Sequence, residues 1–245
     1  MKMLRQYIRR VLREALQAKP SAIFMAGGPA SGKSTAIRKL GIGNQLTVVN
    51  PDDDYEAALK KAGIPLDRKD LLVAYKHAKE TFLAAQEAGD TQAMGDAEPE
   101  YRRLRAIFSQ NMTLFSRARN AAKDLKKSLM GTGDNVLIDG TGGNYREISK
   151  QFKEFTAVGY TVGMIYVDVP LDVSLARNVN RAAQGGRGVD EEDVIRSWKA
   201  VDRNRQAYEK LFKENFFYID AAEEQFDSSV SSIKAGVHSF LNSGV

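Results

Sequence analysis

The stretch that decides the fold is Gly27-Gly28-Pro29-Ala30-Ser31-Gly32-Lys33-Ser34-Thr35, which fits the phosphate-loop pattern G-x-x-x-x-G-K-[ST]. Residues 22–26 before it form a short apolar run bounded by turn residues, which is typical of a buried parallel strand. Residues 35–40 after it favour a helix. The backbone N–H groups of the loop and the positive end of that helix would then point at one place, where a phosphate chain can bind.

The residue types in this loop match the chemistry of a triphosphate. Gly27 and Gly32 permit the turn and the close backbone approach that a side chain would block. The Lys33 ammonium can reach the β- and γ-phosphates, and the Ser34 hydroxyl can ligate Mg²⁺. We therefore expect a nucleoside triphosphate site, and the residues expected to form it are Gly27, Gly28, Ser31, Gly32, Lys33, Ser34 and Thr35.

Four further apolar runs are typical of strands, at residues 46–49, 135–138, 161–167 and 216–219. Helical patterns separate them, which indicates a parallel sheet with crossover connections. The sequence therefore predicts an α/β fold, with a parallel five-stranded sheet flanked by helices, in one domain over residues 1–245.

Three segments are expected to add to this sheet. A basic amphipathic helix is predicted over residues 1–20, and an arginine-rich lid over residues 175–190. Between the second and third strands lies a long helical insertion over residues 55–130, which we expect on the substrate side. Within it, residues 89–91 and 95–99 are predicted to be acidic surface turns.

The composition excludes several kinds of site. The 245 residues are 43% hydrophobic, which is enough for one sizeable core. The chain has no cysteine, and its two histidines are His77 and His238, so the expected metal is Mg²⁺ that arrives with the nucleotide. No apolar run reaches the length of a membrane span, and arginines interrupt any signal-peptide core near the N-terminus. We therefore expect a cytoplasmic protein with no membrane partner.

Acidic residues follow the second and third predicted strands. Asp52 lies at the carboxyl end of a parallel strand, where α/β sheets place their ligands, so it can accept the proton of an attacking hydroxyl. An aspartate of the run Asp52-Asp53-Asp54 could instead cap the next helix, and both roles can be filled within this run. Asp139 closes the third strand and is expected on the Mg²⁺ side. The D-x-x-G letters that begin there also occur in GTPases, but the guanine-reading sequence N-K-x-D is absent.

Arginines mark the segment after the fourth predicted strand. Its glycine pair, Gly185-Gly186, indicates a mobile turn between two helices. Closing such a lid would bring Arg177, Arg181 or Arg187 onto the transferring phosphate, where fixed positive charge stabilises the transition state. Arg177, at the base of the lid, is assigned to nucleotide binding. A merely solvated basic helix is the alternative.

These motifs resemble the zeta-toxin and phage polynucleotide-kinase group of P-loop kinases. The matching parts are the loop at residues 27–35, the strand ends at 50–53 and 138–141, and the lid at 177–189. The resemblance covers the sheet and the lid, but not the long insertion. It implies that ATP and Mg²⁺ bind, that Asp52 acts as the base, and that Arg181 and Arg187 clamp the phosphates.

The sequence leaves alternatives open for the acceptor of the phosphate group. Phage kinases that phosphorylate 5-hydroxymethyluracil in DNA resemble this chain in size and layout, so hydroxymethylated DNA in the cytoplasm of a phage-infected host is the leading expectation. A net charge of +5 favours a polyanionic partner. The insertion carries cations that could track a phosphate backbone and aromatic residues that could stack on bases, namely Arg102, Arg103, Arg105, Arg117, Arg119, Lys123, Lys126, Lys127, Tyr101, Phe108 and Phe115. A solvated helical face over a core aromatic stripe is the alternative for these residues.

Two other functions fit the same motifs. A zeta-toxin-like kinase of a uridine-diphosphate amino sugar would need a small closed pocket rather than a groove for a nucleic acid. A nucleotide-binding switch would bind the triphosphate without transferring a phosphate to any acceptor.

Overall fold

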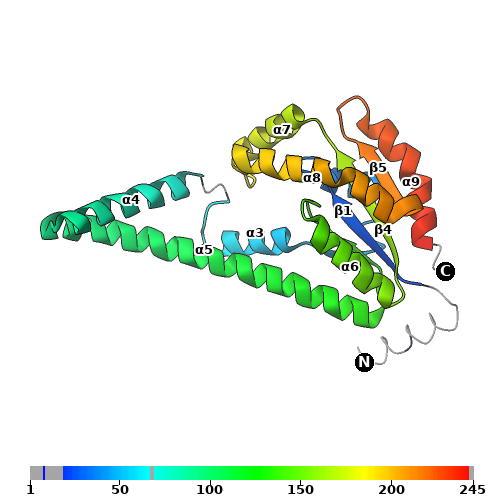
Figure 1. The fold of residues 1–245 in the computed structure, drawn as a ribbon, viewed down its shortest axis with the longest axis horizontal. Coiled ribbons are helices and arrows are strands. Elements are labelled where there is room, and N and C mark those ends of the chain that lie inside the picture. Colours follow the sequence, from blue (N-terminus) through cyan, green and yellow to red (C-terminus); the bar gives the residue numbers. More distant parts are fainter. Residues whose placement is uncertain (1–7, 9–18, 67–68, 243–245) are drawn as a thin grey trace. The chain divides into compact units, whose positions relative to one another are not determined.

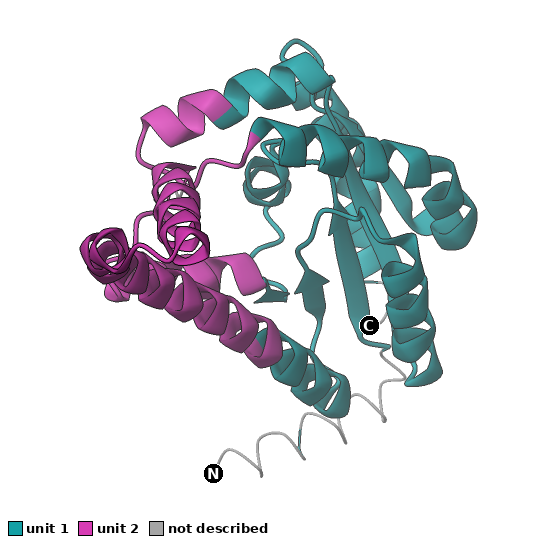
Figure 2. Cartoon of the chain, turned by 60° about the vertical axis from the view of Figure 1, so that its left-hand side comes forward, with its two compact units in different colours: residues 1–50, 122–178, 191–245 teal, residues 51–121, 179–190 magenta. Residues whose placement is uncertain are grey.

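The computed structural model describes residues 8, 19–66 and 69–242. The helix predicted over residues 1–20 falls almost entirely on residues outside this described part. The chain divides into two compact units, coloured teal and magenta in Figure 2. We call residues 1–50, 122–178 and 191–245 the sheet unit, and residues 51–121 and 179–190 the helical unit. The expectation of one domain over the whole chain stays a prediction.

The sheet unit contains a five-stranded sheet in which every pair of neighbouring strands is parallel (Figure 1). This confirms the predicted α/β fold. The strands are β1 (Ser21–Ala26), β2 (Thr47–Val49), β3 (Val136–Ile138), β4 (Thr161–Asp168) and β5 (Phe216–Asp220). Their order across the sheet is β2-β3-β1-β4-β5, so β1 lies between the later strands β3 and β4. Open α/β sheets place their ligands at the carboxyl end of such a central switch point.

Helices cover both faces of this sheet. They are α2 (Lys33–Leu40), α6 (Tyr145–Ala157), α7 (Leu171–Ala183, of which residues 179–183 belong to the helical unit), α8 (Glu191–Phe212) and α9 (Phe226–Asn242), with a short 3-10 turn at Lys213–Asn215. In the described part of the chain, no helix combines the length and the apolar character needed to cross a membrane.

Alternate residues of β1 face opposite sides of the sheet, as the pleat requires. Ile23 and Met25 pack with α2 and α9 in one apolar cluster. Phe24 packs in the other cluster, where its ring lies 6.0 Å from those of Phe155 on α6 and Phe212 on α8. Since all six residues of β1 are buried, the strand is hydrophobic on both faces, and this is why it reads as a continuous apolar run.

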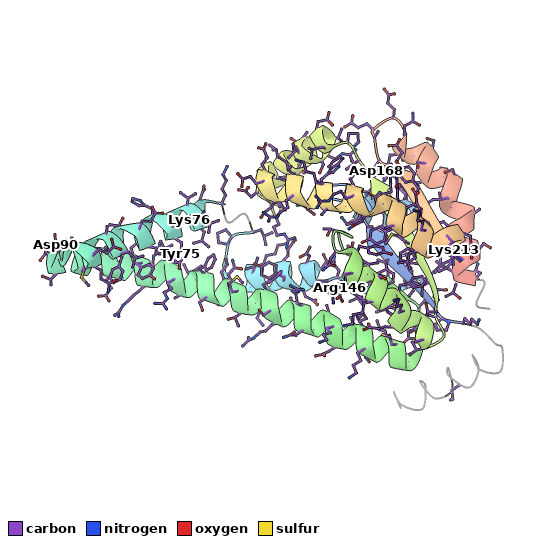
Figure 3. The ribbon with its side chains drawn as sticks, in the orientation of Figure 1. Tyr75, Lys76, Asp90, Arg146, Asp168 and Lys213 are labelled. Atoms are coloured by element: carbon purple, nitrogen blue, oxygen red, sulfur yellow. The ribbon has the colours of Figure 1, made fainter. Side chains whose placement is uncertain are left out.

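The helical unit contains α3 (Pro51–Lys61), α4 (Lys69–Ala88) and the first part of α5 (Thr91–Thr132), whose residues 122–132 belong to the sheet unit. Stacked rings pair α4 with α5, and in two of these pairs, Tyr75 on Phe108 and Phe82 on Tyr101, the centroids are 5.0 Å apart. The pairs run in opposite directions along the two helices, so α4 and α5 form an antiparallel hairpin; Figure 3 labels Tyr75 on it. The turn predicted near residues 89–91 is confirmed, because Gly89 joins the helices with a φ of 66°.

The turn predicted at residues 95–99 is wrong, since α5 continues through it with Pro99 inside the helix. Proline removes one backbone donor and leaves the carbonyl of residue 95 without its helical partner. Two features hold the helix at this place: an ion pair joins Glu98 to Arg102 at 2.6 Å, and the ring of Tyr101 stacks on α4. Packing and charge pairs thus overrule the local preference of a glycine and a proline four residues apart.

We expect Pro99→Ala to stabilise the protein, because alanine restores the N–H that bonds the carbonyl of residue 95. The gain should be about 1–3 kcal/mol in the free energy of unfolding, measured by urea denaturation. Ala97→Gly, two residues earlier, is the control, and it should lower the free energy of unfolding by about 1 kcal/mol because glycine is less favourable than alanine inside a helix. A loss of stability in Pro99→Ala would show that residues 95–99 are not helical.

Candidate functional site

The phosphate loop has a backbone that only glycine can adopt at its ends. Gly27 has a φ of 154°, and Gly32, which caps the start of α2, has a φ of 98°. A Cβ placed on Gly27 would lie 2.6 Å from Ser31 Oγ and 2.7 Å from the carbonyl oxygen of Val167 on β4. The loop therefore passes against the neighbouring strand at a distance that no side chain would permit.

Three other segments of the sheet unit anchor this loop. The Gly27 N–H donates to the carbonyl of Thr141, after β3, at 2.9 Å. Ser174 Oγ, at the start of α7, donates to the carbonyl of Pro29 at 2.7 Å. The ring of Trp198 on α8 lies against Gly28, and its Nε1 donates to the carbonyl of Val169 at 2.7 Å. The loop is thus held in shape by bonds that do not involve a ligand, which is the preorganisation an anion site needs.

The polar groups inside the loop fit a phosphate chain. Lys33 Nζ donates to the carbonyl oxygens of Gly27 at 2.9 Å and Gly28 at 3.1 Å, so its ammonium crosses the loop. Ser31 is fully buried, and its hydroxyl has no hydrogen-bond partner among residues 19–66 and 69–242. A buried hydroxyl of this kind can bond an oxygen of a bound group. Together with the N-terminus of α2, these groups suit the oxygens of a polyphosphate.

Asp139 and Asn50 lie side by side at the carboxyl ends of β3 and β2. The Asp139 N–H donates to the carbonyl of Val49 at 3.0 Å, and its Oδ2 accepts from Asn50 Nδ2 at 3.1 Å. Ser34 is the second residue of α2, after β1, which pairs with β3. In the described residues, no group of three or more histidine, aspartate or glutamate side chains gathers as a metal cage. A hydroxyl and a carboxylate instead fit Mg²⁺, which takes few protein ligands and completes its shell with phosphate and water.

Arg177 lies beside the end of the loop. It is half-buried on α7, its Nη2 donates to the carbonyl of Ala221 at 3.1 Å, and its Nη1 is 4.0 Å from where a Cβ of Gly32 would be. The sheet unit therefore brings Arg177 together with the predicted phosphate-loop residues. Their roles as binding residues stay predictions.

Asp52 and Arg187 form a bidentate ion pair within the helical unit. Nη1 of Arg187 contacts Oδ1 of Asp52 at 3.1 Å, and Nη2 contacts Oδ2 at 3.0 Å. The side chain of Arg187 is 17% exposed, whereas that of Asp52 is 52% exposed. Burial by itself would lower the pKa of Arg187, but the hydrogen bond and the charge of Asp52 outweigh it, so the pKa is raised. The guanidinium is thus a fixed positive charge.

Arg181 lies near the same pair on the last turns of α7. Its Nε is buried and has no hydrogen-bond partner in the described part of the chain. Burial, and then the positive charge of Arg187, lower the pKa of Arg181. The backbone of the following turn packs closely against Arg181 at Gly186, since a Cβ on Gly186 would lie 2.8 Å from Arg181 Cγ. The predicted turn between two helices is therefore present, at residues 184–190, between the end of α7 and the start of α8.

The predicted site residues thus fall into two groups. Those of the phosphate loop, Arg177 and Asp139 lie in the sheet unit, while Asp52, Arg181 and Arg187 lie in the helical unit. Each group is well ordered by its own contacts.

Sequence reasoning gave no role to Asp168, which ends β4 (Figure 3). Its Oδ2 accepts from the Tyr218 hydroxyl at 2.9 Å and from Arg205 Nη1 at 3.3 Å. Burial, followed by the hydrogen bond to Asp168, raises the pKa of Tyr218 to about 12. The sequence did contain a signal for Asp168, because this aspartate ends an apolar strand just as Asp139 does. The sequence could not predict the contact between Asn50 and Asp139, since this contact depends on the pairing of β2 with β3.

Comparisons with known proteins agree with this fold. A family model described as an AAA domain (AAA_33) matches residues 22–208. A crystal structure of a protein from Chloroflexus aurantiacus J-10-fl that was assigned as a kinase superposes with a TM-score of 0.55 at 16% identity, covering 93% of this chain and 99% of that one. At this identity the likeness shows a shared fold. No curated protein matches the sequence.

Two further solved structures are similar at lower scores. One is the AvrRxo1-ORF1:AvrRxo1-ORF2 complex with ATP, at 20% identity and a TM-score of 0.48, with 91% of this chain and 63% of that chain covered. The chain thus spans less than two thirds of that relative. The other comes from the PezAT toxin–antitoxin system of Streptococcus pneumoniae, at 12% identity and a TM-score of 0.44, with 97% and 95% covered.

We expect Gly27→Ala to weaken ATP binding by about tenfold to hundredfold, because the new Cβ would push the loop away from Val167. Gly28→Ala is the matched control in the same loop, since its Cβ would make only ordinary van der Waals contacts, all with Trp198, at 3.4 Å or more. Isothermal titration with ATP measures both. Equal affinities in the two variants would show that the tight backbone approach at Gly27 does not shape the nucleotide site.

Proposed function

Since the chain belongs to the AAA domain family of P-loop kinases, we propose that it transfers the γ-phosphate of ATP to a hydroxyl group of its acceptor. The single observation that supports this most is the phosphate loop, in which Lys33 crosses a glycine cradle at the N-terminus of α2. A fixed cation and aligned N–H groups suit the charge that develops on a transferring phosphate.

Each group of residues has a part in the proposed reaction. The loop and Lys33 bind and orient the triphosphate, with Arg177 beside them. Ser34 and Asp139 would hold Mg²⁺, which neutralises phosphate charge when bound. Arg187 and Arg181 supply positive charge to the transferring group.

Asp52 is the proposed base. Its carboxylate would take the proton of the acceptor hydroxyl as the oxygen attacks phosphorus and the bond to the β-phosphate breaks. The half-exposed carboxylate remains open to an acceptor even while both of its oxygens contact Arg187. Its position in the first turn of α3 also favours the helix, so the helix-stabilising role and the proposed catalytic role are compatible.

We propose a small molecule as the acceptor, because contacts within the insertion weaken the case for a nucleic-acid surface. Tyr101 and Phe108 stack within the α4–α5 hairpin and Phe115 packs edge-on to Tyr55, so these rings are already used in packing. Arg102 and Arg103 pair with Glu98 and Glu100 on their own helix. The contacts therefore favour the core aromatic stripe over a stacking surface for bases.

Labelled ATP identifies the acceptor class. The protein would be incubated with γ-labelled ATP and, separately, a uridine-diphosphate amino sugar, hydroxymethylated DNA and 5′-hydroxyl DNA. We expect label on the small acceptor. Label on DNA would restore the nucleic-acid hypothesis, and ATP binding without label on any acceptor would favour a nucleotide switch.

Lys33→Ala should lower transfer by at least about 100-fold, the scale for losing one well-placed electrostatic stabiliser. Lys39→Ala is the control on the same helix, because Lys39 pairs with the exposed Asp227 and is given no part in the reaction. Turnover is measured by release of label from γ-labelled ATP. Near-normal turnover in Lys33→Ala would end the kinase proposal.

Asp52→Asn should abolish most turnover while ATP affinity stays within a few-fold, because the amide keeps the size of the side chain but cannot accept the proton at neutral pH. The control is Asp53→Asn, at an exposed position next to it in the same helical turn. Loss of ATP binding in Asp52→Asn would make Asp52 a structural or metal-side residue, and Asp53 would then be the better candidate base.

A further inference from the structure

Three residues on one face of α3 surround the guanidinium of Arg187. Asp52, Tyr55 and Glu56 are spaced i, i+3 and i+4, which places them together on a helix. Asp52 makes the bidentate ion pair, Glu56 Oε1 lies 3.5 Å from Arg187 Nε, and the ring centroid of Tyr55 is 5.9 Å from the guanidinium carbon. The guanidinium thus has a carboxylate oxygen near each of its three nitrogens and lies near an aromatic ring.

The ring of Tyr55 is itself fixed by α5. Its hydroxyl donates to Oδ1 of Asn111, and the ring of Phe115, one helical turn further on, packs edge-on at 5.3 Å. Tyr55 is 2% exposed and Asn111 is 1% exposed. Asn111 and Phe115, both on α5, therefore hold the ring of Tyr55 in place.

This polar pair lies in an apolar environment. The buried cluster around Tyr55 consists of Leu59, Ile64 and Ala118, with Leu114 and Phe115 packed against it. Burying an amide there costs free energy unless it is hydrogen-bonded, and an apolar residue would pack as well. The hydrogen bond from the Tyr55 hydroxyl to Asn111 Oδ1 favours one orientation of the Tyr55 ring relative to α5.

We propose that Asn111, in the helical insertion, is a positioning residue for the transfer reaction, which sets Arg187 through Tyr55. This rests on the proposed function, in which Arg187 stabilises the transferring phosphate. The route runs from Asn111 on α5 to the hydroxyl of Tyr55 on α3, and from the ring of Tyr55 to the guanidinium in the lid turn. All of these residues belong to the helical unit. In this proposal the insertion contributes to the reaction by positioning Arg187.

The first test needs no activity. The Nε–H of Arg187 is followed by nuclear magnetic resonance in arginine-labelled protein, with its signal assigned by Arg187→Lys. Asn111→Ala should shift this signal and raise its solvent exchange about five- to thirtyfold, the effect of losing one buried hydrogen bond from the chain of contacts. Tyr55→Phe, which keeps the ring, should act in the same direction, and it serves as the milder variant if Asn111→Ala does not fold.

Gln110→Ala is the matched control, an exposed position next to Asn111 on α5, and should leave the signal unchanged. An unchanged Arg187 signal in folded Asn111→Ala or Tyr55→Phe would overturn the proposal. This result is independent of whether the protein transfers phosphate at all.

The second test separates positioning from a general loss of structure. Asn111→Ala should lower the rate of γ-phosphate release from ATP about five- to thirtyfold with little change in KM for ATP. In an Arg187→Ala background the same change should have no further effect, because its route to the reaction is gone. Multiplicative effects would show that Asn111 acts elsewhere. If Arg187→Ala alone does not slow release, the proposed function of Arg187 fails, while the resonance experiment still decides the positioning role.

Discussion

The turn of the backbone at Gly27 constrains most of the sheet unit. The chain leaves a fully buried strand there and passes the carbonyl of Val167 so closely that a methyl group would not fit. The turn is closed by the Thr141 carbonyl after β3 and by Ser174 at the start of α7. Because segments from both sides of β1 meet at this loop, its shape depends on the order of the strands as much as on its own sequence.

Different forces hold the two groups of candidate residues. In the sheet unit, backbone carbonyls and N–H groups fix the loop, and the side chain of Lys33 is bound by that backbone. In the helical unit, the guanidinium of Arg187 is held by carboxylates and an aromatic ring. Backbone contacts give a rigid phosphate cradle, whereas side-chain contacts can be exchanged for a substrate. This difference suits the proposed roles, in which the loop holds ATP and Arg187 contacts the transferring phosphate.

The composition of the insertion allows two interpretations of its surface. Its cations and aromatic residues resemble a surface for nucleic acid, yet the rings pack between α4 and α5 and two of the arginines pair with glutamates one turn away. Such pairs add a little stability to a long exposed helix. The same helix buries one polar residue, Asn111, against Tyr55, whose ring lies near the guanidinium of Arg187, and the proposed positioning role of Asn111 rests on these two contacts.

By itself the sequence determined the sheet and the phosphate loop. Five apolar runs, the glycine pattern and the acids that close the strands depend on neighbours a few residues apart, and these local rules are strong in a buried parallel sheet. The sequence also marked Asp52, Arg181 and Arg187 as candidates without indicating that Asp52 and Arg187 pair. Tertiary structure alone decided that pairing, the contact of Asn50 with Asp139, and the course of α5 through Pro99. Each joins residues far apart in the chain or sets packing against local preference, so no pattern along the sequence could reveal it.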